Sequence, residues 1–268
     1  MVYIIEFLDH ITPGMDKEIS KEFMKILQKQ GIKFHMQTKV DSIKKNKNGA
    51  VVSTTNKEGK KVNFECDVVL ISVGRKSYIK NLNLEAVGVA LDQKKRIKTD
   101  KNFLTNVKNI YAIGDVIKGP MLAHKAEEEG IAVAENIAGQ SGHVNYDVIP
   151  GVIYTSPEVA AIGKTEEQLN ELNIKYKIGK FPFMANSRAK AIDQSEGFVK
   201  ILSDQTTDKV LGAHIIGNHA GEMIAEIAIA MEFGASSEDI ARTCHAHPTF
   251  SEALKEAALS VDKRAIHS

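Results

Sequence analysis

The segment CHAHPTFSEALKEA places His247 five positions before Glu252 near the C-terminus. If the chain turns between them, the carboxylate can fix the imidazole tautomer and favour its charged form, as a general base near neutral pH requires. Thr249 and Glu252 also match a capping box, in which Glu252 only caps the helix that follows. The spacing leaves both interpretations open.

The same segment contains soft ligand types, because Cys244 and His245 stand next to His247. Structural zinc usually takes four ligands in two spaced pairs, and no second pair is present. The other cysteine, Cys66, is far away in the sequence. We therefore expect no metal site and no redox pair by spacing, and two isolated cysteines suggest a reducing compartment.

Gly114 and Asp115 follow the apolar run IYAI. A carboxylate at the end of a strand can accept hydrogen bonds from ribose-like or ribityl hydroxyls, and a glycine lets the backbone approach a ligand. An ordinary strand-ending turn is the alternative.

Met121, Leu122, Ala123 and His124 stand at the start of a predicted helix. The unpaired N–H groups and positive dipole end of a helix suit an electron-rich acceptor atom. A helix start that simply faces the core is the alternative.

Glu6 ends the first apolar run. In dinucleotide-binding units, an acidic residue at the end of the second strand accepts the ribose hydroxyls. That unit needs a glycine-rich turn upstream, and this sequence contains no GxG. Glu6 alone therefore establishes nothing.

Hydrophobic periodicity predicts the elements that must position these residues. We expect a helix from the N-cap Asp16 to Gly31 and another from about Leu122 to Gly139 that turns Ile137 inward. The predicted strands before residue 76 are 1–8, 32–35, 38–43, 51–55, 61–64 and a strand covered on both faces at 68–73, with a turn region at 44–49. After a polar linker near residue 145, strands in a row with two long helices indicate an α+β layer. Its first helix carries a capping box at Thr165.

Composition excludes several classes of protein. The chain has 268 residues, 43% hydrophobic and 26% charged, which is typical of globular proteins. A net charge of +1 argues against a duplex-binding face, so we expect no nucleic acid. The apolar runs are shorter than the ~20 residues of a membrane-spanning helix, and the opening residues do not resemble a secretory signal. We expect no membrane partner.

Motifs along the whole chain share one order with a known family. In sequence they are EFL, PGMD, LISVGRK, NIYAIGDV, GPMLAHKAEEEG, VIYTSPEVAAIG, FPFMANSRA, LGAHIIG, AGEMIAE and CHAHPTFSEA. Together they resemble the dihydrolipoyl dehydrogenases, the flavin disulfide reductases of the 2-oxo-acid dehydrogenase complexes. Glutathione and mercuric reductases resemble the chain less, because CHAHPT followed by SEA and MLAHKAEEEG match the lipoamide branch.

The resemblance implies a fold of α/β and α+β parts. These are a partial NAD-binding domain at 1–75, a central segment that completes the FAD domain at 76–145, and an α+β dimerisation domain at 146–268. It also implies a homodimer in which His247 serves the other subunit. The implied partners are lipoyl domains, and the implied compartment is bacterial cytoplasm or the mitochondrial matrix.

The resemblance also implies roles for single residues. His247 would be the acid/base residue for the dithiol of dihydrolipoamide, oriented by Glu252. Two cofactors would bind, with FAD held at Asp115, Met121, Leu122, Ala123 and His124, and NAD at Glu6, Val40 and Gly74. Because Glu6 is acidic and no arginine follows it in that loop, NAD is expected over NADP.

The chain departs from the family in one respect. The family's FAD-binding glycine fingerprint, CxxxxC redox disulfide and NAD fingerprint would all lie before Met1. The chain therefore resembles the C-terminal portion of a family member. We expect no dehydrogenase activity from this chain alone, and weak or no FAD retention. A non-catalytic dimerisation or binding module is the alternative function.

Overall fold

The computed structural model describes residues 1–268 and contains both helices and strands, which confirms the mixed α and β class. The chain divides into two compact units. Unit 1 comprises Met1–Val69 and Asp147–Ser268, and unit 2 comprises Leu70–Tyr146. Most of the predicted first and third domains fall within unit 1, and the division into three domains stays a prediction.

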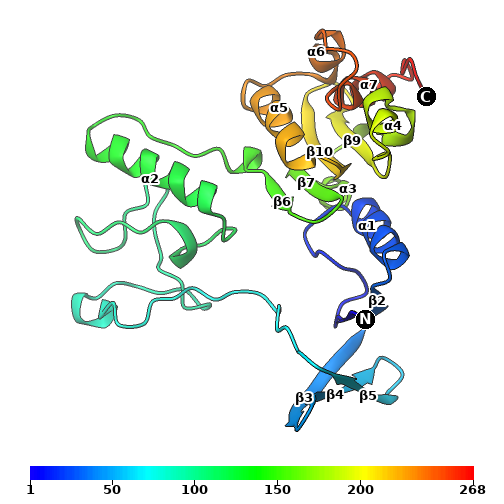
Figure 1. The fold of residues 1–268 in the computed structure, drawn as a ribbon. Helices are drawn as coiled ribbons and strands as arrows, with labels where there is room; N and C mark the ends of the chain where they lie inside the picture. Colours follow the sequence, from blue (N-terminus) through cyan, green and yellow to red (C-terminus); the bar gives the residue numbers. More distant parts are fainter. The chain divides into compact units, whose positions relative to one another are not determined.

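The elements of unit 1 fall into two groups along the chain (Figure 1). The N-terminal group consists of β1 (Tyr3–Ile5), α1 (Lys17–Lys29), β2 (Lys33–His35), β3 (Thr38–Asn46), β4 (Gly49–Asn56) and β5 (Lys61–Cys66). The C-terminal group consists of β6 (Gly151–Ile153), β7 (Glu158–Gly163), α3 (Glu166–Glu171), β8 (Tyr176–Pro182), α4 (Ser187–Ala191), β9 (Phe198–Asp204), β10 (Val210–Gly217), α5 (Ala220–Glu232), α6 (Ser237–Arg242) and α7 (Glu252–Val261).

Helix α1 begins and ends as the sequence predicted. Asp16 is its N-cap, and the carboxylate accepts the N–H of Glu18 at 3.0 Å. Gly31 follows the helix with a φ of +96°, a conformation that glycine adopts without strain. Ile19 and Phe23 are buried in the core that α1 shares with the C-terminal sheet.

The predicted strand at 68–73 is wrong. The segment forms no strand, and Leu70 is 88% and Val73 90% exposed. An apolar run of this kind suits a strand covered on both faces, but a strand needs neighbours that satisfy its backbone groups. The nearest parallel pair in the sequence, β1 with β2, forms a sheet of two strands only.

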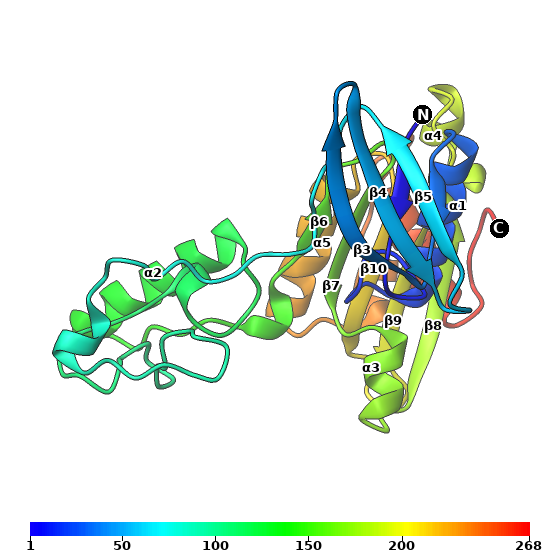
Figure 2. The same ribbon diagram turned by 90° about the horizontal axis from the view of Figure 1, so that it is seen from below.

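Strands β3, β4 and β5 form a separate antiparallel sheet (Figure 2). The strands predicted at 51–55 and 61–64 are confirmed as β4 and β5, which form a hairpin with Gly59 in its turn at a φ of +78°. The predicted turn region 44–49 is too long, because β3 continues to Asn46 and pairs there with Gly49. Lysine and asparagine in that stretch mark an exposed strand end.

The C-terminal sheet is antiparallel in the order β6-β7-β10-β9-β8. Its two faces belong to different cores, since Ile215 packs with α5 and α7 whereas Ile216 packs with α1. Figure 1 shows α5 and α7 on one side of this sheet and α1 on the other. The capping box predicted at Thr165 is present at the start of α3, with Gln168 as its partner.

Unit 2 is organised around α2 (Ala123–Ile137) and a core of apolar residues that includes Ile97, Phe103 and Ala132. The prediction that Ile137 points inward is wrong, because its side chain is 64% exposed. Charged residues take the buried positions of the helix instead. Lys125 and Glu129 are both 0% exposed.

Candidate functional site

His247 and Glu252 lie together at the start of α7. The His247 Nδ1 is 2.8 Å from the Glu252 Oε1. The His247 side chain is 61% exposed and that of Glu252 18%. Because an ionised carboxylate only accepts hydrogen bonds, Nδ1 carries a proton, and Nε2 is the basic nitrogen of the neutral ring. The pair therefore presents a proton acceptor to solvent on an oriented imidazole.

Glu252 also anchors the loop before α7, since its Oε2 accepts the N–H of Thr249 at 2.8 Å. This contact is one half of the capping box that the sequence left open as the alternative. The other half is absent, because Ser251 is the N-cap and the Thr249 hydroxyl donates to the carbonyl of Ala246 at 2.7 Å. Burial raises the pKa of Glu252, but the Thr249 amide and the His247 ring together lower it by more, so the net pKa lies below its ordinary value. The carboxylate thus stays ionised beside the imidazole.

The neighbouring soft ligands turn to other partners. His245 Nε2 lies 2.6 Å from Glu226 Oε1, and its Nδ1 lies 2.9 Å from the carbonyl oxygen of Thr243. Cys244 is exposed as a free thiol. The sequence carried no signal for the contact between His245 and Glu226, because Glu226 lies on α5.

Asp115 lies in a short 3-10 turn in unit 2 and is held by Arg75. The guanidinium Nη2 contacts Asp115 Oδ2 at 2.5 Å, and Nη1 donates to the carbonyl of Met121 at 3.2 Å. Arg75 therefore joins two parts of the predicted flavin site, and the sequence analysis missed it. Its signal was a basic residue directly after the apolar run LISVG.

Two buried residues of α2 hold the backbone before Asp115. Lys125 Nζ donates to the carbonyl of Gly114 at 3.0 Å, and Glu129 Oε2 accepts the Gly114 N–H at 2.6 Å. Lys125 and Glu129 pair with each other at 3.1 Å, and Tyr146 donates to Glu129 at 2.6 Å. Both polar groups of Gly114 are thus fixed from one helix face. The i, i+4 spacing of Lys125 and Glu129 was the signal available in the sequence.

The residues predicted to hold the flavin from α2 stand at its N-terminus. Leu122 is its N-cap and provides no side-chain cap. The first turn of this helix, with Ala123 and His124, therefore has no capping side chain at Leu122 to accept its N–H groups.

The residues predicted for NAD fall in both units. Glu6 directly follows β1, and its Oε1 accepts the N–H of Leu8 at 2.8 Å. Val40 is 41% exposed on β3. Glu6 and Val40 belong to unit 1, whereas Gly74, with a φ of +100°, belongs to unit 2.

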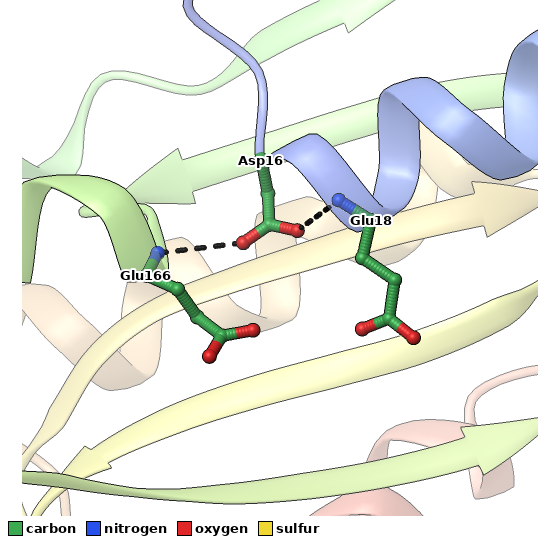
Figure 3. A group of neighbouring side chains, drawn as sticks. All are labelled: Asp16, Glu18 and Glu166. Atoms are coloured by element: carbon green, nitrogen blue, oxygen red, sulfur yellow. Dashed lines mark hydrogen bonds between the residues drawn. The ribbon is translucent and has the colours of Figure 1, made fainter.

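Three carboxylates converge beside the C-terminal sheet. Figure 3 shows Asp16 accepting the backbone N–H groups of Glu18 and Glu166, so it caps the first turns of both α1 and α3. The ligand oxygens of these three residues lie within 4.8 Å of one another. Lys200 Nζ contacts all three, at 3.0 Å from Asp16 and 3.2 Å from Glu18. One buried ammonium group is thus shared by the three carboxylates, and Lys180 is a second cation beside Glu18.

Two family models match the chain. Residues 149–258 match the dimerisation domain of pyridine nucleotide-disulphide oxidoreductases, and residues 1–130 match the pyridine nucleotide-disulphide oxidoreductase model. The chain belongs to the pyridine nucleotide-disulphide oxidoreductase family.

Members of this family are similar along the whole chain. The mitochondrial dihydrolipoyl dehydrogenase of Pisum sativum is 54% identical over 267 residues, which are 99% of this chain and 53% of that protein. The mitochondrial dihydrolipoyl dehydrogenase of Homo sapiens is 55% identical over 262 residues, 97% of this chain and 52% of that protein. The chain spans about half the length of these curated relatives.

A solved structure supports the fold assignment. The HOCl-induced flavoprotein disulfide reductase RclA from Escherichia coli is 26% identical with a TM-score of 0.84. The match covers 94% of this chain and 57% of that chain. None of the helices of the 268-residue chain has the length and apolar character needed to span a lipid bilayer.

Proposed function

We propose that this chain acts in a dihydrolipoyl dehydrogenase, in which His247 is the acid/base residue for the dithiol of dihydrolipoamide. The supporting observation is the 2.8 Å contact between His247 and Glu252 on a ring that stays 61% exposed. A thiol reacts as its thiolate. In the proposal, Nε2 of His247 takes the thiol proton, and the Glu252 carboxylate stabilises the imidazolium that results.

We also propose that Asp115 and residues Met121, Leu122, Ala123 and His124 hold FAD. The positive dipole end of α2, whose N-cap Leu122 provides no side-chain cap, fits an electron-rich flavin edge, and the exposed side of Asp115 fits a ribityl hydroxyl. When bound, the flavin supplies the two-electron chemistry that connects dithiol oxidation to NAD. This chain's own contribution is to hold Asp115 through Arg75 and the Gly114 backbone through Lys125.

We also propose that Glu6 and Val40, both in unit 1, contribute to binding NAD. The position of Glu6 directly after a parallel strand supports this, because ligands of such sheets bind at the carboxyl ends of the strands. A carboxylate there accepts ribose hydroxyls and repels a 2′-phosphate, so NAD is expected over NADP. The 268 residues contain no glycine-rich turn to hold the pyrophosphate, so we expect weak binding by this chain alone.

The remaining parts of the proposal concern assembly and turnover. The match to a dimerisation domain supports a homodimer, in which His247 serves the partner's flavin, with lipoyl domains as the substrate carriers. The mitochondrial relatives support the mitochondrial matrix, with bacterial cytoplasm as the other compartment. The two cysteines of the chain are both free. Without a paired redox disulfide, we propose that these 268 residues alone turn over no dihydrolipoamide.

An NADH-dependent lipoamide assay tests the proposal. The chain is assayed alone and together with the N-terminal half of the Pisum sativum relative. We expect activity only in the mixture, and a loss of about 10² to 10⁴ in rate in the mixture with His247→Gln. His267→Gln is the matched control, because His267 also pairs with a glutamate at 2.8 Å. Equal activity of His247→Gln and the unchanged chain would refute the proposal.

A non-catalytic dimerisation or binding module is the second candidate. The dimerisation-domain match and the free cysteines Cys66 and Cys244 favour it. Sedimentation equilibrium measures the dimer, and flavin absorbance retained after gel filtration measures FAD binding. A stable dimer that stays inactive in the mixture, without retained flavin, supports the module over the enzyme.

A further inference from the structure

His245 is a nearly buried histidine with both ring nitrogens engaged. Its side chain is 5% exposed. The Nε2 atom faces the Glu226 carboxylate of α5 at 2.6 Å, and the Nδ1 atom faces the carbonyl oxygen of Thr243 at 2.9 Å. A backbone carbonyl only accepts hydrogen bonds, and so does an ionised carboxylate. Both nitrogens therefore have to donate, and the ring that satisfies both contacts is an imidazolium.

The surrounding charges decide whether the ring keeps that second proton. The hydrogen bond to Glu226 raises the pKa of His245 above its ordinary value, although burial lowers it, and the carbonyl of Thr243 raises it further. Lys255 on α7 opposes the charge, because its Nζ donates to the same Thr243 carbonyl at 2.9 Å. Glu226 from α5 and Lys255 from α7 are thus the charged groups that face His245.

These contacts hold the segment that contains His247. Thr243 receives hydrogen bonds from both His245 and Lys255, and His245 is tied to α5 through Glu226. Two residues further along the chain, His247 meets Glu252 on α7. The segment therefore runs between two helices, and the pair of His245 and Glu226 ties it to α5.

We propose that His245 is a positioning residue, a buried imidazolium that clamps the His247 segment to α5, and that loss of its proton releases the segment. This rests on the proposed function, because it assigns a regulation to the acid/base site. Deprotonation leaves one bare ring nitrogen facing an oxygen, which is a repulsive contact. Because the pKa of His245 is raised, the clamp is complete below pH 6.5, the ordinary pKa of histidine. It is lost as the pH rises through the pKa that His245 has in the folded chain.

Histidine side-chain nitrogen NMR on the full chain tests the clamp directly. We expect both His245 nitrogens to be protonated at pH 6.5, and one to lose its proton at higher pH. The amide of Thr249 and the ring nitrogens of His247 should shift with the same midpoint. A neutral His245 at pH 6.5, or a His245 titration that leaves His247 unchanged, overturns the proposal.

A pair of variants adds a second measurement. In His245→Gln, we expect the alkaline step in the His247 signals to disappear and the amide exchange of Thr249 to rise about tenfold or more, as the loss of a charged hydrogen bond implies. His267→Gln removes a histidine that pairs with the buried Glu256 at 2.8 Å; it should keep the alkaline step in the His247 signals and leave the amide exchange of Thr249 unchanged. Equal behaviour of the two variants contradicts the clamp. If His245→Gln does not fold, the titration of the unchanged chain decides.

These readouts do not depend on turnover. A clamp seen by NMR together with an inactive mixture would refute the proposed function and leave His245 as a positioning residue for the segment. An active mixture with a neutral His245 would refute only the clamp.

Discussion

Lys200 offers the sharpest test of how the N-terminal helix is attached to the C-terminal sheet. Its side chain is 0% exposed and contacts both oxygens of Asp16, at 3.0 and 3.1 Å. It also contacts Glu18 and Glu166. The substitution Lys200→Met keeps most of the side-chain volume and removes the only ammonium group that reaches Asp16 in the structure.

The size of the effect follows from burial. Removing one partner of a buried ion pair costs about 3–5 kcal/mol, because the other charge is left unpaired. Asp16 is 1% exposed and takes most of this cost, whereas Glu18 and Glu166 are 43% and 25% exposed and regain water. The backbone N–H groups of Glu18 and Glu166 still bind Asp16. We therefore expect the lower end, about 3 kcal/mol.

The loss should depend on pH in a defined direction. Burial raises the pKa of Asp16, but in the unchanged chain the charge and hydrogen bonds of Lys200 and the backbone N–H of Glu166 lower it by more, so the net pKa lies below its ordinary value. A carboxyl group with a lowered pKa stabilises the folded chain at a pH above the ordinary carboxyl pKa. This stability is lost as the pH falls through the pKa of the folded state. Without Lys200 the buried carboxyl is more stable protonated, so the difference between the two proteins should shrink from pH 7 towards pH 4.

Hydrogen exchange followed by mass spectrometry measures the loss in α1 and β9. A cost of about 3 kcal/mol corresponds to exchange about 10²-fold faster. Lys177→Met is the matched control on the neighbouring strand, because Lys177 pairs with Asp262 at 2.8 Å but is 37% exposed. An exposed pair contributes about 0–1 kcal/mol. Equal exchange in the two variants, or no pH dependence in Lys200→Met, would refute the reasoning.

Three further outcomes follow from single groups. Glu129→Gln removes the charge that pairs with a buried lysine, so the Gly114 amide should lose about 3–5 kcal/mol of protection, measured by hydrogen exchange. Burial lowers the pKa of His214 despite Asp16. The folded chain should therefore lose stability as the pH falls below 6.5. In His214→Gln, the free energy of unfolding measured with urea should fall less steeply with pH in this range. In Gly179→Ala, the new Cβ would meet the carbonyl oxygen of Ala257 at 2.0 Å, so α7 must shift, and urea unfolding should show a loss of about 1–3 kcal/mol.

Local signals in the sequence determined much of the secondary structure. Asp16 before α1 and Thr165 before α3 are caps that act on residues two to three positions away. The strands of the C-terminal sheet were recognisable from their apolar runs. The pair of His247 and Glu252 was also a local prediction, because only five positions separate them and one turn of chain brings them together.

Tertiary structure decided the features that depend on distant residues. Lys200 meets Asp16 across 184 positions, and Arg75 meets Asp115 across 40. His245 finds Glu226 only because α5 lies beside its segment. Each of these contacts needs two elements packed together, and neither residue alone carries a periodic or spacing signal for its partner.

The apolar run at 68–73 is a case in which the local sequence signal was present but the tertiary structure did not form the predicted strand. Its composition determined that it is suited to a covered strand, but its backbone forms a strand only where paired strands accept its hydrogen bonds. In this chain β1 and β2 pair only with each other, and the run stays exposed. The sequence by itself thus set local geometry and the proton-handling pair, whereas burial, charge pairing and strand neighbours were decided by the folded chain, because they are properties of surroundings that no local segment contains.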